Sequence, residues 1–238
     1  MRIDLLEGAF VKKQWARHFS PSINEEVEKQ VKELLEQGFI RPSNSSVSAP
    51  VVPIRKPDGT TRVCIDYRDL NKWTLEIRYP LPLISEKLKI LANKKYFAKL
   101  DLRSGFWQLP IDEDCKWLTA FVTLSGLYEW NRLPFGPKNG PSVFQSRMHD
   151  ILHGLEDSMC VTFMDDILIF GNDWHEFLCK LNKVLKRLDD YNATVKITKC
   201  SFDMQEVEYL GTICNSPGIK LSRVEAVQNT PVPKTLLI

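Results

Sequence analysis

Two adjacent carboxylates, Asp165 and Asp166, lie between two apolar runs at 159–163 and 167–170. Runs of this length predict two buried strands with the carboxylates on the tight turn between them. At ~4 Å two such charges repel by roughly 1 kcal/mol in water and by about 4 kcal/mol at an effective dielectric near 20. A divalent cation would remove that cost, whereas an exposed turn would solvate both charges. The dipeptide alone fits either a cation site or an ordinary solvated turn.

A third carboxylate, Asp101, ends another apolar run at 96–100 and lies 64 residues before Asp165. That interval is long enough for a hairpin and a helix, so the two strands can be neighbours in one sheet. Three carboxylates would then meet at one sheet edge. Mg²⁺ prefers oxygen ligands and substrate phosphates, and two such ions can activate a hydroxyl nucleophile and stabilise a leaving pyrophosphate. The spacing permits this site but does not demonstrate it.

Other chemistries find less support in the chain. His149 and His153 stand four residues apart, as zinc ligands on a helix do, but Asp150 replaces the usual glutamate base and no third ligand is evident. Exposed histidines on a helix explain the pair better. The sequence has no phosphate-binding G-x-x-x-x-G-K-[ST], no G-x-G-x-x-G and no G-x-S-x-G. Its 6 cysteines include no C-x-x-C pair, so we expect reduced thiols in an intracellular protein.

The elements that would position these residues follow from apolar spacing and from turn residues. An Asp-Gly turn at 58–59 joins two strand-like runs as a hairpin. A helix enters at 21–24 and closes at Gly38, and Pro141 opens another of about thirteen residues. Strands and helices alternate irregularly, so we predict an α+β fold. The other predicted helices are 84–91 and 174–188, and the predicted strands are 49–55, 61–66, 96–100, 109–111, 119–123, 127–130, 159–163, 167–170 and 207–214.

Composition is that of a globular protein, with 238 residues, 43% apolar and 26% charged. The length predicts one large domain or two intertwined subdomains. No apolar run approaches the ~18–20 residues that span a bilayer, and the start has no signal-peptide core. The net charge of +2 is unevenly divided, with 18 Lys and Arg against 12 Asp and Glu in residues 1–100, and 11 against 14 in 101–200. A polyanion beside a cation site would fit this division, and so would random surface variation.

Eight stretches, in order along the chain, resemble the reverse transcriptase of Ty3/gypsy-type LTR retrotransposons. One such motif would be weak, but the ordered set is specific and covers nearly all of residues 24–234. The stretches are EQGFIRPS at 36–43, RVCIDYRDLNK at 62–72, RYPLP at 78–82, KLDLRSG at 99–105, LPFG at 133–136, DDILIF at 165–170, KCSF at 199–202 and EYLG at 208–211.

The resemblance implies the fingers and palm of a right-hand polymerase, the palm with a ferredoxin-like antiparallel sheet and helices on one face. It implies RNA-directed DNA synthesis from dNTPs on a primed RNA or DNA template, with two Mg²⁺ ions that Mn²⁺ can replace. The implied regions are an N-terminal extension at 1–22, fingers at 23–76 and 109–139, palm at 77–108 and 140–217, and the start of a thumb at 218–238.

The resemblance also assigns roles to single residues. Asp101, Asp165 and Asp166 match the catalytic, metal-binding carboxylates. The other matched positions are Lys56 and Arg62 for the incoming triphosphate, Phe106 for exclusion of a ribose 2′-OH, Phe135 and Gly136 for template–dNTP contact, Leu210 and Gly211 for the primer grip, and Phe163 and Met164 beside the carboxylates. Taken singly, Lys56 and Arg62 are more often solvated hairpin charges, and Phe106 and Phe135 are more often core residues.

Several residues depart from the family pattern. Phe163 stands where a tyrosine is usual, so a ring is kept and a hydroxyl is lost. The other departures are Trp107 for a common histidine, the polar Asn131 and Arg132 at usually apolar positions, and Pro137 and Gly140 for a usual leucine and alanine. We therefore expect reduced or altered activity. The alternative is a catalytically impaired remnant or a non-catalytic nucleic-acid-binding module.

The end of the sequence carries a further expectation. Similar proteins continue beyond a Pro-Val-Pro stretch like 231–233 into thumb, connection and RNase H regions. Residues 1–238 contain no match to those regions, nor to a protease or an integrase. We therefore expect this portion alone to hold primer–template weakly, with the rest of a Pol polyprotein as its partner. The expected location is intracellular, in cytoplasmic virus-like particles with nuclear access, and not secreted or membrane-bound.

Overall fold

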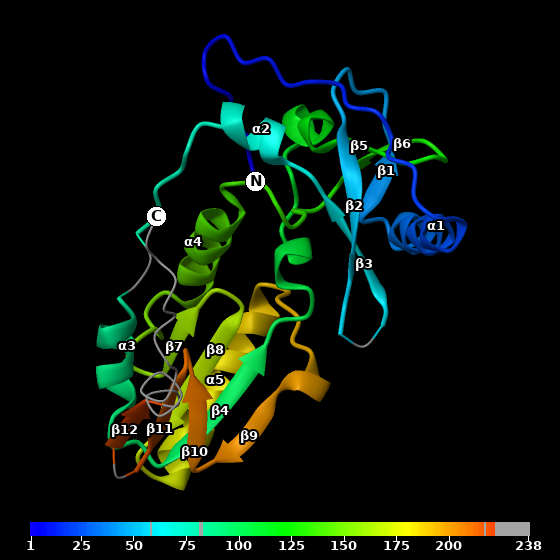
Figure 1. Ribbon diagram of the computed structural model, residues 1–238. Coiled ribbons are helices and arrows are strands. Elements are labelled where there is room, and N and C mark those ends of the chain that lie inside the picture. Colours follow the sequence, from blue (N-terminus) through cyan, green and yellow to red (C-terminus); the bar gives the residue numbers. More distant parts are fainter. Residues whose placement is uncertain (58, 81–82, 217, 222–238) are drawn as a thin grey trace, which may run out of the picture. The chain divides into compact units, whose positions relative to one another are not determined.

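The computed structural model describes residues 1–57, 59–80, 83–216 and 218–221. The chain divides into two units, each made of two segments that are distant in the sequence (Figure 1). Unit 1 comprises Met1–Pro80 and Ser104–Arg147, and unit 2 comprises Leu81–Arg103 and Met148–Ile238. Each unit combines helices with a largely antiparallel sheet, which confirms the predicted α+β class. Within the described residues, no helix is long and apolar enough to cross a lipid bilayer.

Unit 1 is built on a five-stranded sheet with the strand order β1-β6-β5-β2-β3. All its pairings are antiparallel except the one between β2 and β5. The predicted Asp-Gly hairpin is confirmed, because β2 pairs with β3 along five residues, from Val51↔Ile65 to Arg55↔Thr61. The elements are α1 (Pro21–Glu36), β1 (Ile40–Pro42), β2 (Ala49–Arg55), β3 (Thr61–Ile65), α2 (Arg68–Trp73), β5 (Phe121–Val122), β6 (Leu127–Trp130), the 3₁₀ helices η1 (Gly105–Gln108) and η2 (Glu113–Thr119), and the start of α4 (Gly140–Leu152).

The core of unit 1 explains why these segments fold as they do. Val27 and Val31, one helical turn apart, are buried from α1 against the sheet, as their spacing predicts. The predicted strand at 109–111 is wrong, because only an isolated bridge joins Pro110 to Arg132. Proline has no N–H for a ladder, and 3₁₀ turns lie on both sides of it. The strand predicted at 119–123 shortens to β5 because η2 takes its first residue.

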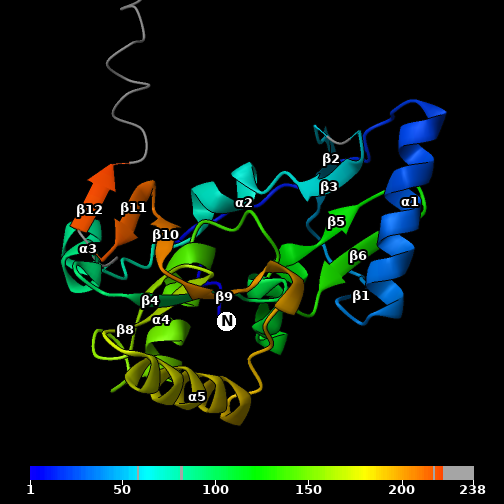
Figure 2. The same cartoon turned by 90° about the horizontal axis from the view of Figure 1, so that it is seen from below.

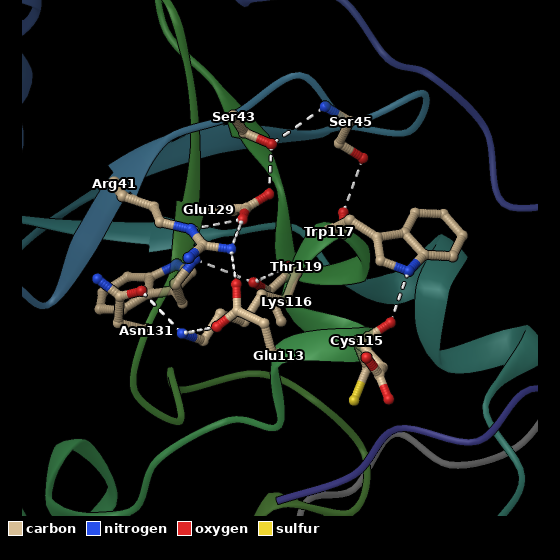
Figure 3. Close-up of polar contacts among 12 residues, drawn as sticks. Arg41, Ser43, Ser45, Glu113, Cys115, Lys116, Trp117, Thr119, Glu129 and Asn131 are labelled. Atoms are coloured by element: carbon tan, nitrogen blue, oxygen red, sulfur yellow. Dashed lines mark hydrogen bonds and ion pairs between the residues drawn. The ribbon is translucent and has the colours of Figure 1, made fainter.

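A polar network fastens the edge strand β1 to the rest of unit 1 (Figure 3). Arg41 on β1 donates from Nε to the buried carboxylate of Glu129 on β6 at 2.8 Å, and also forms an ion pair with Glu113 on η2. The Ser43 hydroxyl donates to the other Glu129 oxygen. Because Glu129 is only 6% exposed, these bonds replace the water that its charge would otherwise need.

One departure from the family pattern predicts a gain in stability. Gly140 begins α4, and a Cβ added there would lie 3.9 Å from Leu133 Cδ1, which is an ordinary contact. We expect Gly140→Ala to raise the free energy of unfolding by about 0.5 kcal/mol, because alanine loses less backbone entropy on folding. Thermal unfolding of the two proteins measures the change. Gly136→Ala is the contrasting control, since Gly136 has φ +111 and its Cβ would lie 3.0 Å from Tyr67. A stabilised Gly136→Ala, or a destabilised Gly140→Ala, would contradict the account.

Unit 2 is built on a four-stranded antiparallel sheet with the order β7-β8-β4-β9. Helix α5 packs on one face of it, against β8 and β4 (Figure 2). A second small sheet has the order β10-β11-β12. A cluster formed by α3, the four-stranded sheet, β10 and β11 includes Leu91, Phe97, Leu168, Tyr209 and Cys214. The elements are α3 (Ile84–Leu91), β4 (Tyr96–Asp101), the end of α4, β7 (Cys160–Phe163), β8 (Asp166–Gly171), α5 (Trp174–Asp190), η3 (Ile197–Lys199), β9 (Ser201–Met204), β10 (Glu206–Tyr209), β11 (Thr212–Asn215) and β12 (Gly218–Leu221).

Two predictions for unit 2 need correction or fall outside what is described. The single strand predicted at 207–214 is a hairpin, since β10 pairs with β11 around Leu210 and Gly211, which have φ 51 and 75. Of the segment at 218–238 that we expected to begin a thumb, β12 is described, while 222–238 lie outside the described residues. Residue 58 of the predicted Asp-Gly turn and residues 81–82 of the family-like RYPLP stretch also lie outside them.

Candidate active site

The carboxylates lie where two central strands of unit 2 meet. Asp101 ends β4 and pairs directly with Asp166, the first residue of β8. Phe163 at the end of β7 also pairs with Asp166, which leaves Met164 and Asp165 as the two-residue turn. Met164 has φ 54, a left-handed conformation that costs a non-glycine residue energy. The predicted strand–turn–strand is therefore confirmed, except that only Asp165 lies on the turn while Asp166 begins β8, and the pairing brings Asp101 to it.

The register also decides which side chains share a face. Cross-strand partners, and residues two apart on one strand, point to the same side of a sheet. Lys99, Asp101, Asp166 and Phe163 therefore share one face. This face also carries Phe97 and the rest of the apolar cluster against β10 and β11. The carboxylates thus lie at the edge of an apolar layer.

Electrostatics show that the three carboxylates interact. Burial raises the pKa of Asp165, and the charges of Asp166 and Asp101 raise that pKa further. Two ammonium groups offset part of this charge. Lys99 Nζ lies 3.0 Å from Asp166 Oδ2, and Lys199 Nζ lies 3.5 Å from Asp101 Oδ2. The arrangement concentrates three carboxylates and two lysines in one small region of unit 2.

The donor set fits a hard divalent cation. Carboxylate oxygens are the ligands that Mg²⁺ uses, with waters and substrate phosphates completing its six positions. In the part of the chain that the structure describes, however, no three His, Cys, Asp or Glu side chains are already arranged as a metal-holding group. Asp101 and Asp166 instead contact lysines. The assignment of Asp101, Asp165 and Asp166 as metal ligands stays a prediction.

In unit 1, the residues matched to dNTP contact form a second group. The Arg62 guanidinium lies over the Phe135 ring, 4.7 Å from its centre, and the Phe106 ring lies 4.9 Å from that of Phe135. Gly136 follows with φ +111, and its carbonyl accepts a hydrogen bond from Asn71 at 2.9 Å. Lys56 is separate, exposed in the loop of the β2–β3 hairpin. The structure therefore brings Arg62, Phe106 and Phe135 together as one cationic, aromatic surface.

The residues matched to a primer grip form the β10–β11 turn. Leu210 and Gly211 both have positive φ, as a two-residue hairpin turn of type I′ requires. Tyr209, just before the turn, is fully buried, and its hydroxyl has no hydrogen-bond partner among the described residues. Burial, and then the charge of Asp166, raise the pKa of Tyr209. A leucine held at φ 51 marks a conformation that the surrounding hairpin enforces.

Sequence reasoning missed the two lysines of this site. Lys99 could have been found, because it lies two positions before Asp101 on a predicted strand and so shares its face. Lys199 approaches from η3 through a tertiary contact that no local pattern signals.

Among the residues that depart from the family pattern, Asn131 has two hydrogen-bond partners in unit 1. It donates to the Gly38 carbonyl at 3.0 Å and accepts from Lys116 at 3.2 Å.

Comparisons with known proteins agree with this geometry. Residues 54–214, about two thirds of the chain, match the family described as "Reverse transcriptase (RNA-dependent DNA polymerase)". The Pol polyprotein of transposon 297 from Drosophila melanogaster is 43% identical over 216 residues, covering 87% of this chain and 20% of that protein. The Pol polyprotein of transposon gypsy, from the same organism, is 36% identical over 219 residues, covering 89% of this chain and 21% of that protein.

A solved structure gives the same result for the fold. The foamy viral protease–reverse transcriptase in complex with an RNA/DNA hybrid superposes with a TM-score of 0.83 at 29% identity, covering 96% of this chain and 31% of that one. The carboxylate turn on two paired central strands, together with these matches, defines the fold of the reverse transcriptase family. The chain belongs to the reverse transcriptase family, and its relatives include gypsy-type retrotransposon Pol polyproteins. It spans about a fifth of the length of these two Pol relatives.

Proposed function

We propose that this chain is the fingers and palm portion of an RNA-directed DNA polymerase that adds dNTPs to a primer 3′-OH. The observation that carries the proposal is the pairing of Asp101 with Asp166 beside the Asp165 turn, in a chain of the reverse transcriptase family. The fingers, at 23–76 and 109–139, would lie within unit 1. The palm, at 77–108 and 140–217, would take most of unit 2 together with 77–80, 104–108 and 140–147 of unit 1. The foamy viral relative holds an RNA/DNA hybrid, which supports a primed template as the partner.

The proposed roles follow the chemistry of each side chain. Asp101, Asp165 and Asp166 would hold two Mg²⁺ ions, or Mn²⁺ in their place, and these ions would activate the primer hydroxyl and stabilise the leaving pyrophosphate. Arg62 would bind the triphosphate through its planar fork, with Lys56 as a second cation. Phe106, Phe135 and Gly136 would contact the nucleotide, and Leu210 and Gly211 the primer end. Phe163 and Met164 would set the position of the carboxylate turn.

Primer extension tests the proposal. A DNA primer annealed to an RNA template, dNTPs and Mg²⁺ or Mn²⁺ should give extended primer, and EDTA should abolish it. The alternative function is a non-catalytic nucleic-acid-binding remnant. One observation favours it: Phe163 occupies a position where the family usually has a tyrosine. The alternative predicts salt-sensitive binding of primer–template without extension. The remaining Pol regions, a virus-like particle and an intracellular location belong to the same proposal.

Sugar selection by Phe106 is a separate prediction. Its ring is held between Phe135 at 4.9 Å and Phe144 at 5.1 Å, so its position is fixed. We expect Phe106→Val to raise ribonucleotide over deoxyribonucleotide incorporation by about 10- to 100-fold, because a removed steric exclusion is worth ~1–3 kcal/mol. Incorporation of matched dNTP and rNTP by both proteins measures it. Phe144→Leu keeps the Phe106 ring and loosens one of its two supports, so it should change the ratio by less than Phe106→Val does. An unchanged ratio in Phe106→Val would remove the assigned role.

The unusual Phe163 supplies another test. Its ring packs against the apolar cluster of Phe97 and Tyr209, and a tyrosine would keep these contacts while adding a hydroxyl beside the carboxylates. If Phe163 has lost a catalytically useful hydroxyl of the usual tyrosine, Phe163→Tyr should increase the rate of dNTP incorporation. Phe163→Leu, which loses the ring, should decrease it. A Phe163→Tyr protein that is slower than the unmodified chain would show that phenylalanine is the adapted residue here.

A further inference from the structure

The contact between Lys99 and Asp166 has no part in the proposed polymerase chemistry. Lys99 lies on β4, its Nζ is 3.0 Å from Asp166 Oδ2, and both side chains are about one third exposed, at 31% and 33%. In this arrangement an ammonium group contacts an oxygen that would face a metal ion. The ammonium group of Lys99 would therefore compete with a bound metal ion for this oxygen of Asp166.

The strand register enforces this contact. Lys99 and Asp101 are two residues apart on β4, so both point to the same face, and Asp101 is the direct partner of Asp166. Lys99 is thus the diagonal neighbour of Asp166 across the ladder, within reach of a long side chain. Asp101 pairs directly with Asp166, and the charges of both act on Asp165, so three like charges gather here and a nearby cation is favourable when no metal is bound.

We propose that Lys99 is the counter-ion of Asp166 in the metal-free protein and must release it when a divalent cation binds, so that Lys99 weakens metal binding. The inference rests on the proposed role of the carboxylates as metal ligands. A lysine suits this exchange, because its flexible stem lets the ammonium group move into water while the stem stays packed. Lys99 would then keep the like-charged carboxylates together before metal and substrate arrive.

The expected effect is modest and measurable. A partly exposed ion pair is worth up to about 1 kcal/mol, which corresponds to a roughly two- to fivefold change in affinity. We expect Lys99→Met to bind Mn²⁺ about two- to fivefold more tightly, and Lys99→Arg, which keeps the charge, to stay close to the unmodified protein. The exposed Lys95, just before the other end of β4, gives the matched control Lys95→Met, which removes the same charge away from Asp166.

The experiment is titration of the whole chain with Mn²⁺, followed by electron paramagnetic resonance of the free ion, without nucleotide or nucleic acid. Thermal unfolding gives a second readout. Without metal, Lys99→Met should melt at a lower temperature than the unmodified chain. Saturating Mn²⁺ should raise the melting temperature of Lys99→Met by more than it raises that of the unmodified chain. Asp165→Asn serves as the carboxylate control.

The outcomes separate the inference from the proposed function. Tighter binding in Lys99→Met alone, with binding lost in Asp165→Asn, supports the inference. Equal or weaker binding in Lys99→Met, with binding still lost in Asp165→Asn, overturns the counter-ion role and leaves the carboxylate site intact. Mn²⁺ binding that is absent, or unaffected by Asp165→Asn, overturns both.

Discussion

The Asp165→Asn variant is expected to fold normally and to incorporate nucleotides on the order of 10³-fold more slowly. In the proposed role, Asp165 is a charged ligand of the metal ions, so its removal weakens their binding and the stabilisation of charge in the transition state. Loss of even a single neutral stabilising group costs about 10²–10³-fold. Asparagine has the same shape as aspartate, so the β7–β8 turn can keep its geometry. Rapid-quench kinetics of a single incorporation measures the change.

Stability separates loss of catalysis from loss of fold in that variant. Burial, Asp166 and Asp101 all raise the pKa of Asp165, which means that its ionised form is disfavoured in the folded metal-free protein. Asp165→Asn should therefore melt at the same or a higher temperature at neutral pH. Asp150→Asn, at an exposed position on α4, is the matched control and should change neither rate nor melting. An active Asp165→Asn protein would exclude the assigned role.

The Lys87→Met variant is expected to lose about 3 kcal/mol of unfolding free energy, the largest stability effect of any single change proposed. Lys87 on α3 is only 6% exposed and pairs with Asp157 at 2.6 Å and with Glu156 at 3.4 Å. Glu156 also accepts bonds from Thr162 and from His149 Nδ1, the latter at 2.8 Å. Removing one partner of a buried pair costs ~3–5 kcal/mol, and the lower end applies here because Glu156 keeps Thr162 and His149 as partners. The melting temperature should fall by roughly 6–12 °C.

Matched variants and pH give this prediction its controls. Lys89→Met removes an exposed lysine from the same helix and should have little effect. The double variant Lys87→Met/Glu156→Gln should recover part of the loss, because the unpaired charge is gone. Burial raises the pKa of Glu156, but Thr162, His149 and Lys87 lower it by more. The stability from this cluster is therefore present above the ordinary value of 4.5 and lost as pH falls below it. A Lys87→Met protein as stable as the parent would contradict this account.

How much of the structure was predictable depends on whether the signal was local. The helices at α3, α4 and α5 and the strands around Asp101, Asp165 and Asp166 follow from apolar spacing, Pro141 and turn residues, and all are confirmed. The strand predicted at 109–111 failed because Pro110 makes only an isolated bridge, while Ile111 is buried by packing in the core of unit 1. The Leu210-Gly211 turn was missed because a leucine at φ 51 carries no turn signal in its residue type.

The candidate site shows the same limit. The sequence indicated which carboxylates lie at strand ends. The register that pairs Asp101 with Asp166 agrees with that prediction. Of the two ammonium groups beside them, that of Lys99 was readable from its spacing to Asp101, whereas that of Lys199 was not, since it arrives from η3 through a tertiary contact. The polar network around Glu129 was not readable from the sequence, because a glutamate in a short strand looks like an exposed residue until Arg41 and Ser43 are placed beside it.

Template-directed incorporation of one nucleotide tests the central claim most directly. The chain would be mixed with a DNA primer on an RNA template, Mg²⁺ and each dNTP in turn, and single-turnover extension followed. The account predicts that the primer grows only with the nucleotide complementary to the template base, that EDTA stops it, and that Asp165→Asn does not support it. Primer–template that binds and is never extended, in either Mg²⁺ or Mn²⁺, would contradict the polymerase assignment and favour a nucleic-acid-binding remnant.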